Sequence, residues 1–73
     1  MAAKRPLRAS PRQREVLSLL SHGHTDSQIA VELGISVATV RAYLARLYKD
    51  NGFGNRTEAA IAWLESVKAT NGP

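Results

Sequence analysis

The chain has 73 residues, no cysteine and a net charge of +4. A chain of this length forms one small domain, which on folding buries only about 60% of the surface that its unfolded form exposes. Without cysteine it has neither disulfides nor thiolate metal ligands, so a core of short helices must hold it together. No apolar run approaches the roughly 20 residues of a membrane span, and no signal peptide is evident, which predicts a cytoplasmic protein.

The first nine residues are basic and show no hydrophobic period. Lys4, Arg5 and Arg8 lie in this stretch, together with a proline. The composition predicts a flexible basic arm over residues 1–9, which either contacts phosphates or is an ordinary frayed terminus. Cations gathered at one end of a chain favour nucleic acid or an acidic surface as the partner.

A first helix is indicated from about Pro11 to about His22. Ser10 is a suitable N-cap, proline fits the first helical position, and Gln13 can complete a capping box by bonding the Ser10 amide. Gly23 can take the left-handed conformation that ends a helix. The apolar face would consist of Val16, Leu17, Leu19 and Leu20.

His22 and His24 flank Gly23, where they could suggest a metal site. Neither a cysteine nor an acidic cluster accompanies them, so we interpret them as turn residues, with His22 near the negative end of the first helix dipole. We therefore expect neither a metal nor a cofactor.

A second, short helix follows Thr25, with Gln28 completing a second capping box and Asp26 placed near the positive end of the helix. Gly34 ends this helix. A short helix, a turn of about three residues containing glycine, and a second helix at a steep angle define the helix-turn-helix motif. The residues expected to face inward are Ile29, Ala30, Leu33 and Ile35.

The stretch from Ser36 to Lys49 predicts a helix over residues 37–49 with two different faces. Ser36 is its N-cap. The spacing of one apolar stripe predicts that it faces the core, and this stripe consists of Val40, Tyr43, Leu44, Leu47 and Tyr48. The opposite face carries three cations, no acid and small residues between the charges, and consists of Ala38, Arg41, Ala42, Ala45, Arg46 and Lys49. Such a face can approach a polyanion closely.

A fourth helix is predicted over residues 56–68, with Asn55 as its cap and Glu58 at the capping-box position. The preceding Phe53 is expected to fold back onto the core. Six consecutive apolar residues, 59–64, exceed what one buried stripe requires, so the helix either sinks deeply into the core or presents a second apolar face to a partner. Candidates for a dimerisation face are Ile61, Trp63 and Val67.

Four blocks together, SPRQREVL, IAVELGIS, TVRAYLARLY and NRTEA, resemble the C-terminal DNA-binding domain of LuxR-type, or NarL/FixJ-type, bacterial transcription regulators. The similarity covers about residues 9–64. It implies an all-α, four-helix helix-turn-helix domain over residues 10–69, with a tri-helical core, a C-terminal dimerisation helix and a tail at 70–73. It also implies a recognition helix in the major groove of double-stranded DNA and a homodimer on inverted half-sites.

The resemblance also implies roles for individual residues. Base contacts map onto Arg41, Ala42 and Ala45. Phosphate contacts map onto Ser36, Thr39, Tyr43, Arg46 and Lys49, to which the basic arm would add Lys4, Arg5 and Arg8. Four positions depart from the usual pattern. Ala45 stands where a basic or polar residue is common, so base readout would depend more on Arg41, and Asn51 stands where leucine is usual, which leaves the end of the third helix open. Gln13 replaces the usual glutamate but still serves the cap, and Gly54 stands where a polar or basic residue is common.

The sequence therefore predicts a bacterial transcription regulator that binds DNA, or the output domain of a response regulator, located in the cytoplasm and on the nucleoid when bound. RNA polymerase is a further candidate partner. One alternative is the promoter-recognition region of a sigma factor, although such a region usually ends soon after the recognition helix. Another is a protein-interaction module that docks through helix 56–68. An enzyme is disfavoured, because the sequence offers no nucleophile elbow, phosphate-cradling glycine loop or pair of catalytic carboxylates.

Overall fold

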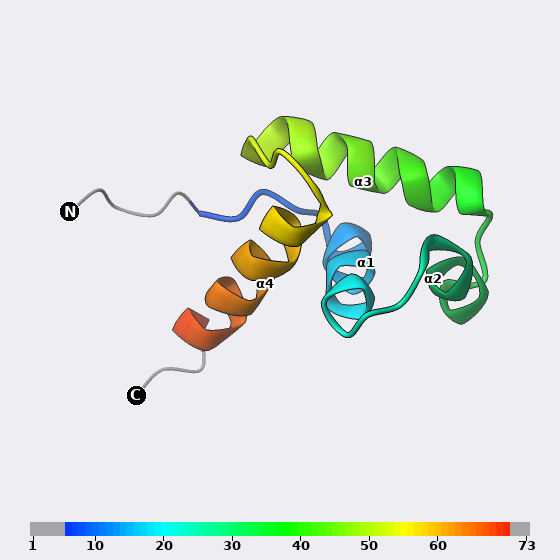
Figure 1. Cartoon of the computed structure of the whole chain (residues 1–73), viewed down its shortest axis with the longest axis horizontal. Coiled ribbons are helices and arrows are strands. Elements are labelled where there is room, and N and C mark those ends of the chain that lie inside the picture. Colours follow the sequence, from blue (N-terminus) through cyan, green and yellow to red (C-terminus); the bar gives the residue numbers. More distant parts are fainter. Residues whose placement is uncertain (1–5, 71–73) are drawn as a thin grey trace.

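A computed structural model describes residues 6–70, with side chains through Lys68, and contains four α-helices in that range (Figure 1). They are α1 (Pro11–Ser21), α2 (Asp26–Leu33), α3 (Val37–Asn51) and α4 (Arg56–Thr70). The predicted all-α class and all four helices are confirmed; α3 and α4 each run two residues beyond their predicted ends. No single helix within residues 6–70 is long and apolar enough to cross a bilayer.

Both predicted capping boxes are present at the starts of α1 and α2. The Ser10 hydroxyl accepts a bond from the Gln13 amide at 3.2 Å, and the Gln13 side chain accepts from the Ser10 amide at 2.8 Å. Thr25 and Gln28 repeat this arrangement at 3.1 and 2.8 Å. These reciprocal bonds satisfy amides that a helix start leaves without partners, and so fix where each helix begins.

The start of α4 uses a modified version of the predicted cap. The Asn55 side chain accepts from the Glu58 amide at 2.9 Å, as expected of an N-cap. The Glu58 carboxylate, however, accepts from the Gly54 amide, one residue earlier than in a standard capping box. A Cβ at Gly54 would lie 3.1 Å from this carboxylate, so a larger residue there would require the Glu58 side chain to shift by a few tenths of an ångström.

The core lies around α1, which contacts each of the other three helices. Its buried residues come from every helix: Val16, Leu17, Leu20, Ile29, Ala30, Val40, Leu44, Leu47 and Ala59. The helices α2 and α3 meet at 109°, and Ala30, only 5% exposed, provides the small side chain near this steep crossing. Gly34, at φ +68°, makes the turn between them, as the helix-turn-helix pattern predicts.

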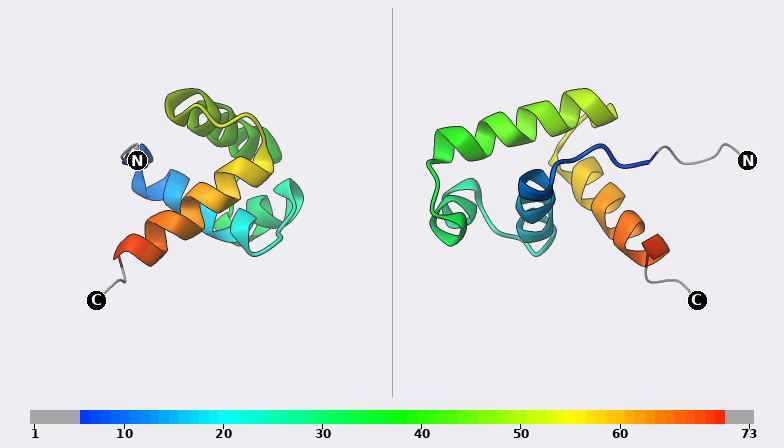
Figure 2. Two further views of the ribbon diagram at one scale, coloured as in Figure 1. Left: turned by 60° about the vertical axis from the view of Figure 1, so that its left-hand side comes forward. Right: turned by 180° about the vertical axis from the view of Figure 1, so that it is seen from behind.

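The inward stripe of α3 is as predicted. Val40, Leu44 and Leu47 are buried, and Tyr43 and Tyr48 pack half-buried against the core. The other helices all lie on one side of α3, so that α3 forms an edge of the molecule (Figures 1 and 2). Its opposite face is therefore left uncovered.

The last turn of α3 holds the segment that precedes α1. The Asn51 side chain accepts from the Arg8 amide at 2.7 Å and donates to the Arg8 carbonyl at 2.9 Å; it also donates to the Leu47 carbonyl at 2.9 Å. Leu7 and Ala9 pack against the core. Residues 7–9, which the sequence placed in a flexible arm, are thus attached to the domain, while Lys4 and Arg5 lie outside the described residues.

We expect Asn51→Ala to lower the free energy of unfolding by about 1–2 kcal/mol, because it removes all three of these hydrogen bonds. Urea denaturation measures the change. The neighbouring Asp50→Ala is the matched control: it breaks only an exposed ion pair with Arg46, which is worth about 0–1 kcal/mol. Equal losses in the two variants would contradict a structural role for the Asn51 amide.

Candidate nucleic-acid interface

The outer face of α3 is exposed along its whole length. The exposed residues are those predicted from the sequence: Ala38, Arg41, Ala42, Ala45, Arg46 and Lys49. Three of them are cations. The three alanines between them have short side chains, so the helix backbone can come close to a flat or grooved anionic surface.

Arg41, Ala42 and Ala45, the predicted base-contacting residues, lie together on this face within about one helical turn. The Arg41 side chain is 71% exposed, and its Nε lies 3.4 Å from a carboxylate oxygen of Asp26. The two alanines are also exposed and carry no polar group. The patch therefore has one strong hydrogen-bond donor and two methyl groups.

Four predicted phosphate-contacting residues occupy the start and flanks of α3. The Ser36 hydroxyl caps the helix by accepting from the Thr39 amide at 3.0 Å, and the two hydroxyls are 2.9 Å apart. Tyr43 is half-buried against the core. Arg46 is 70% exposed, with its Nε 3.0 Å from Asp50.

The remaining described cations of the predicted set gather near the C-terminal end of α3. Lys49 is exposed in the last turn of the helix. Arg8 is exposed, and the bonds of its backbone to Asn51 place it beside the same end. The structure thus attaches the backbone of a cation from before α1 to the last turn of α3.

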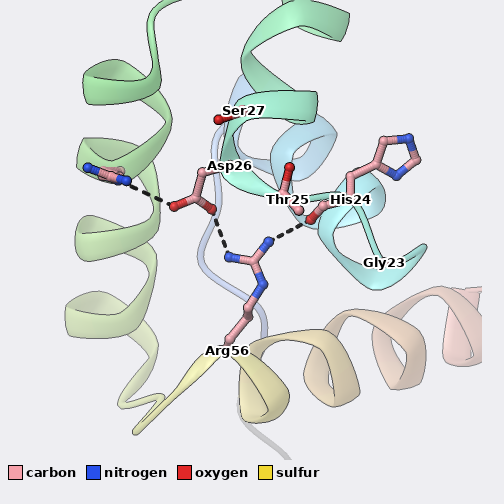
Figure 3. A pocket seen from close by; sticks show the side chains of 7 residues that line it. Gly23, His24, Thr25, Asp26, Ser27 and Arg56 are labelled. Atoms are coloured by element: carbon pink, nitrogen blue, oxygen red, sulfur yellow. Dashed lines mark hydrogen bonds and ion pairs between the residues drawn. The ribbon is translucent and has the colours of Figure 1, made fainter.

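Asp26 joins three helices at one edge of this face, an arrangement that the sequence analysis missed. One oxygen accepts from Nη1 of Arg56 at 2.8 Å, and Nη2 of Arg56 donates to the His24 carbonyl at 2.6 Å (Figure 3). The other oxygen faces Arg41. These groups line a surface depression formed by Gly23, His24, Thr25, Asp26, Ser27, Arg41 and Arg56.

From the sequence, Asp26 was assigned a role only at the positive end of α2, and Arg56 was assigned none. The two residues are 30 positions apart, and neither helical spacing nor capping patterns connect positions at that distance. The opposite charges at the starts of two predicted helices were the only available signal.

The hydrogen bond from Arg56 lowers the pKa of Asp26 below its usual value, although partial burial acts in the opposite direction. The bond from Arg41 adds a smaller lowering effect. Asp26 is therefore ionised throughout the neutral range and is paired with two guanidinium groups.

The histidines lie in the α1–α2 turn, as predicted. Nδ1 of His22 is 2.7 Å from the Ser18 carbonyl, and Nδ1 of His24 is 3.0 Å from the Leu19 carbonyl. Both rings thus interact with carbonyl groups of α1. Residues 6–70 contain no group of three or more side chains arranged to hold a metal ion.

The three residues predicted for dimerisation differ in their exposure. Ile61 is 51% exposed, whereas Trp63 packs half-buried against the core and Val67 is also half-buried. Leu64, which was not singled out, is 54% exposed. The apolar surface that α4 offers to solvent is therefore centred on Ile61 and Leu64, which are three positions apart and share one side of the helix.

The pairing of Asp26 predicts a specific pH dependence. Because its folded-state pKa is lowered, its contribution to stability is present above the unfolded-state pKa, about 3.9, and is lost as the pH falls through the folded-state value. The difference in unfolding free energy between the wild type and Asp26→Asn should be largest near neutral pH and shrink in acid. Urea denaturation across this range measures it.

The matched control for that measurement is Glu32→Gln, which removes an exposed acid from the same helix. If the difference between the wild type and Asp26→Asn stays constant from neutral pH to about pH 3, the ion pair with Arg56 does not stabilise the fold.

Sequence comparison finds relatives among bacterial regulators. The chain is 38% identical over 58 residues to the "Probable HTH-type transcriptional regulator GfsR" of Streptomyces halstedii, covering 80% of this chain and 24% of that protein. It is 45% identical over 53 residues to the two-component response regulator PprB of Pseudomonas aeruginosa, covering 73% and 19%. With response regulator Rre1 of Synechocystis the identity is 41% over 49 residues, covering 67% and 21%.

The matched region spans about a quarter or less of the length of these curated relatives. No solved structure matches the chain significantly. The family described as "Bacterial regulatory proteins, luxR family" matches residues 9–63, which include α1, α2, α3 and the first half of α4. The relatives above are described as a transcriptional regulator and two response regulators, and the family match supports DNA-binding transcription regulation. The chain belongs to the luxR family of bacterial regulatory proteins.

Proposed function

We propose that this chain binds double-stranded DNA at specific sequences, with α3 in the major groove, and serves as a transcription regulator or as the output domain of one. The observation that carries the proposal is the uncovered basic face of α3, held at the edge of the fold by a buried stripe on the same helix. A major groove admits one α-helix, and such a face supplies both cations and hydrogen-bond donors to it.

Arg41 is the residue that reads sequence in this proposal. A guanidinium can donate two parallel bonds to O6 and N7 of guanine, the commonest specific contact in the major groove. Ala42 and Ala45 lie beside it and are exposed, so their methyl groups can contact the methyl group of thymine. In this proposal, the arginine selects for guanine and the two alanines select for thymine at neighbouring positions.

Most of the affinity would come from phosphate contacts, which position the helix without reading the bases. The described groups suited to this role are Ser36, Thr39, Tyr43, Arg46, Lys49 and Arg8. They lie at both ends and along the flanks of α3, so they can hold the helix on either side of the groove. Lys4 and Arg5, which lie outside the described residues, are further proposed phosphate contacts.

We also propose that two copies bind an inverted repeat through α4. The support is the exposed apolar pair Ile61 and Leu64, with Val67 and Trp63 half-buried on the same helix. A two-fold interface places the same patch of each copy against the other, and DNA with two inverted half-sites has matching symmetry.

Selection from a random duplex library near physiological salt, followed by sizing of the complex, tests both proposals. An enriched inverted repeat bound by two chains would support sequence-specific binding and the α4 dimer together. One asymmetric site bound by a single chain would overturn the dimer and favour the sigma-like alternative. No enrichment would overturn specific recognition by this chain and favour a module that docks through helix 56–68.

Arg41→Ala should lower discrimination at one base position by about 1–3 kcal/mol, because it removes the donor that reads guanine. Competition binding with single-base variants of the selected site measures the loss. Lys68→Ala on α4 also removes one exposed cation and should leave the base preference intact. An unchanged preference in Arg41→Ala would remove this residue from the base contacts.

Lys49→Ala should weaken binding to specific and nonspecific duplexes alike, since a phosphate contact carries no sequence information. The slope of log affinity against log salt should fall by about one unit. Titrations at several salt concentrations measure this slope. If the slope is the same as for the wild type, Lys49 does not contact phosphate.

A further inference from the structure

We propose that Asp26 is a specificity-determining positioning residue: its carboxylate holds Nε of Arg41, so that the two terminal nitrogens of Arg41 are presented to a guanine edge. The inference rests on the proposed role of Arg41 in DNA recognition and adds a residue from a different helix to that site. Asp26 itself does not contact the base.

The first support is the choice of atoms in the contact. A guanidinium has five N–H groups in one plane, of which Nε carries one and the two Nη atoms carry four. A carboxylate oxygen of Asp26 lies 3.4 Å from Nε of Arg41, and this contact does not involve either Nη atom of Arg41. Those two nitrogens can donate in parallel to O6 and N7 of guanine. The contact with Asp26 therefore uses only the Nε donor, which the guanine contact does not need.

The second support is that Asp26 is itself held in place. Its side chain is 25% exposed, and its other oxygen is bonded by Arg56 at 2.8 Å. Arg56 is bonded in turn to the His24 carbonyl at 2.6 Å, so the carboxylate is fixed from α4 and from the turn before α2 (Figure 3). A fixed carboxylate can orient the guanidinium of Arg41, which is 71% exposed and otherwise has many rotamers.

The third support is the sign of the charge. An acid next to a DNA-facing surface repels phosphate, so it lowers affinity for DNA of any sequence. It also competes with phosphate for the Arg41 guanidinium, and so disfavours nonspecific binding modes. Asp26 therefore acts in two ways with the same outcome: it favours the guanine contact and opposes contacts that ignore sequence.

The test compares wild type, Asp26→Asn, Arg41→Ala and the double variant at the base pair that Arg41 reads. Asparagine keeps the size of the side chain and removes its charge. Asp26→Asn should cut the preference for the correct base by roughly two- to fivefold, as the loss of an exposed ion pair allows. Its affinity for nonspecific DNA should stay the same or rise. In the Arg41→Ala background the substitution should not reduce the preference further.

Glu32→Gln is the matched control, because it removes one negative charge from the same helix without touching the contact to Arg41. Affinities are corrected for the folded fraction, taken from unfolding curves in the same buffer. Asp26→Ser, which is too short to reach Arg41, provides a second variant that removes the carboxylate. Both variants lose the ion pair with Arg56, so the correction for the folded fraction applies to each of them.

The outcomes separate the two proposals. Loss of preference in Arg41→Ala but none in Asp26→Asn or Asp26→Ser would overturn the positioning role and leave the proposed function standing. Unchanged preference in Arg41→Ala would overturn both, because no base contact would remain to be oriented. An equal loss in Glu32→Gln would trace the effect to overall charge and would overturn the role of Asp26.

Discussion

The structure depends on the burial of one stripe of α3 against α1 and α2. Leu47 and Val40 of this stripe are completely buried in the core, and so are Leu17 and Val16 of α1. Burying a side chain of this size contributes about 1.5–3 kcal/mol, so a few such contacts account for much of the stability of a small domain. Because the buried stripe fixes the rotation of α3 about its axis, it also determines that Arg41, Ala42 and Ala45 point away from the protein. Core packing and the proposed recognition surface are two sides of one helix.

A second constraint connects this helix to α4. Asp26 and Arg56 form an ion pair between the starts of α2 and α4, and the same carboxylate lies beside Arg41 on α3. The luxR-family match extends beyond the helix-turn-helix to residue 63 and so includes Arg56. Apart from its proposed role in dimerisation, the fourth helix holds, through one arginine, the acid that faces the proposed base-reading residue. Substitutions at the start of α4 should therefore be considered when DNA recognition by this domain is interpreted.

Local signals in the sequence were sufficient for much of this architecture. Capping residues and glycines marked where helices begin and end, and the spacing of apolar residues correctly assigned the inner and outer faces of α3, because these features depend on neighbours within one or two turns. Contacts between distant positions could not be predicted in the same way. Asn51 reaches Arg8 across 43 positions and Asp26 reaches Arg56 across 30, and such pairs form only once the helices have packed. The position of Trp63 could not be predicted for the same reason: an apolar run on one helix does not show which of its residues will pack against the core.

The bonds between Asn51 and Arg8 have a mechanical consequence. The backbone just before α1 is tied to the final turn of α3, and not only to the helix that it enters. Tension on a segment joined ahead of residue 6 would therefore act both on Leu7, which packs against the core, and on the end of α3 through Arg8. A tether in that position would act on the orientation of α3 directly. The same tether attached after α4 would pull on α1 first, since α4 packs mainly on α1. The two ends of this small domain are thus mechanically unequal.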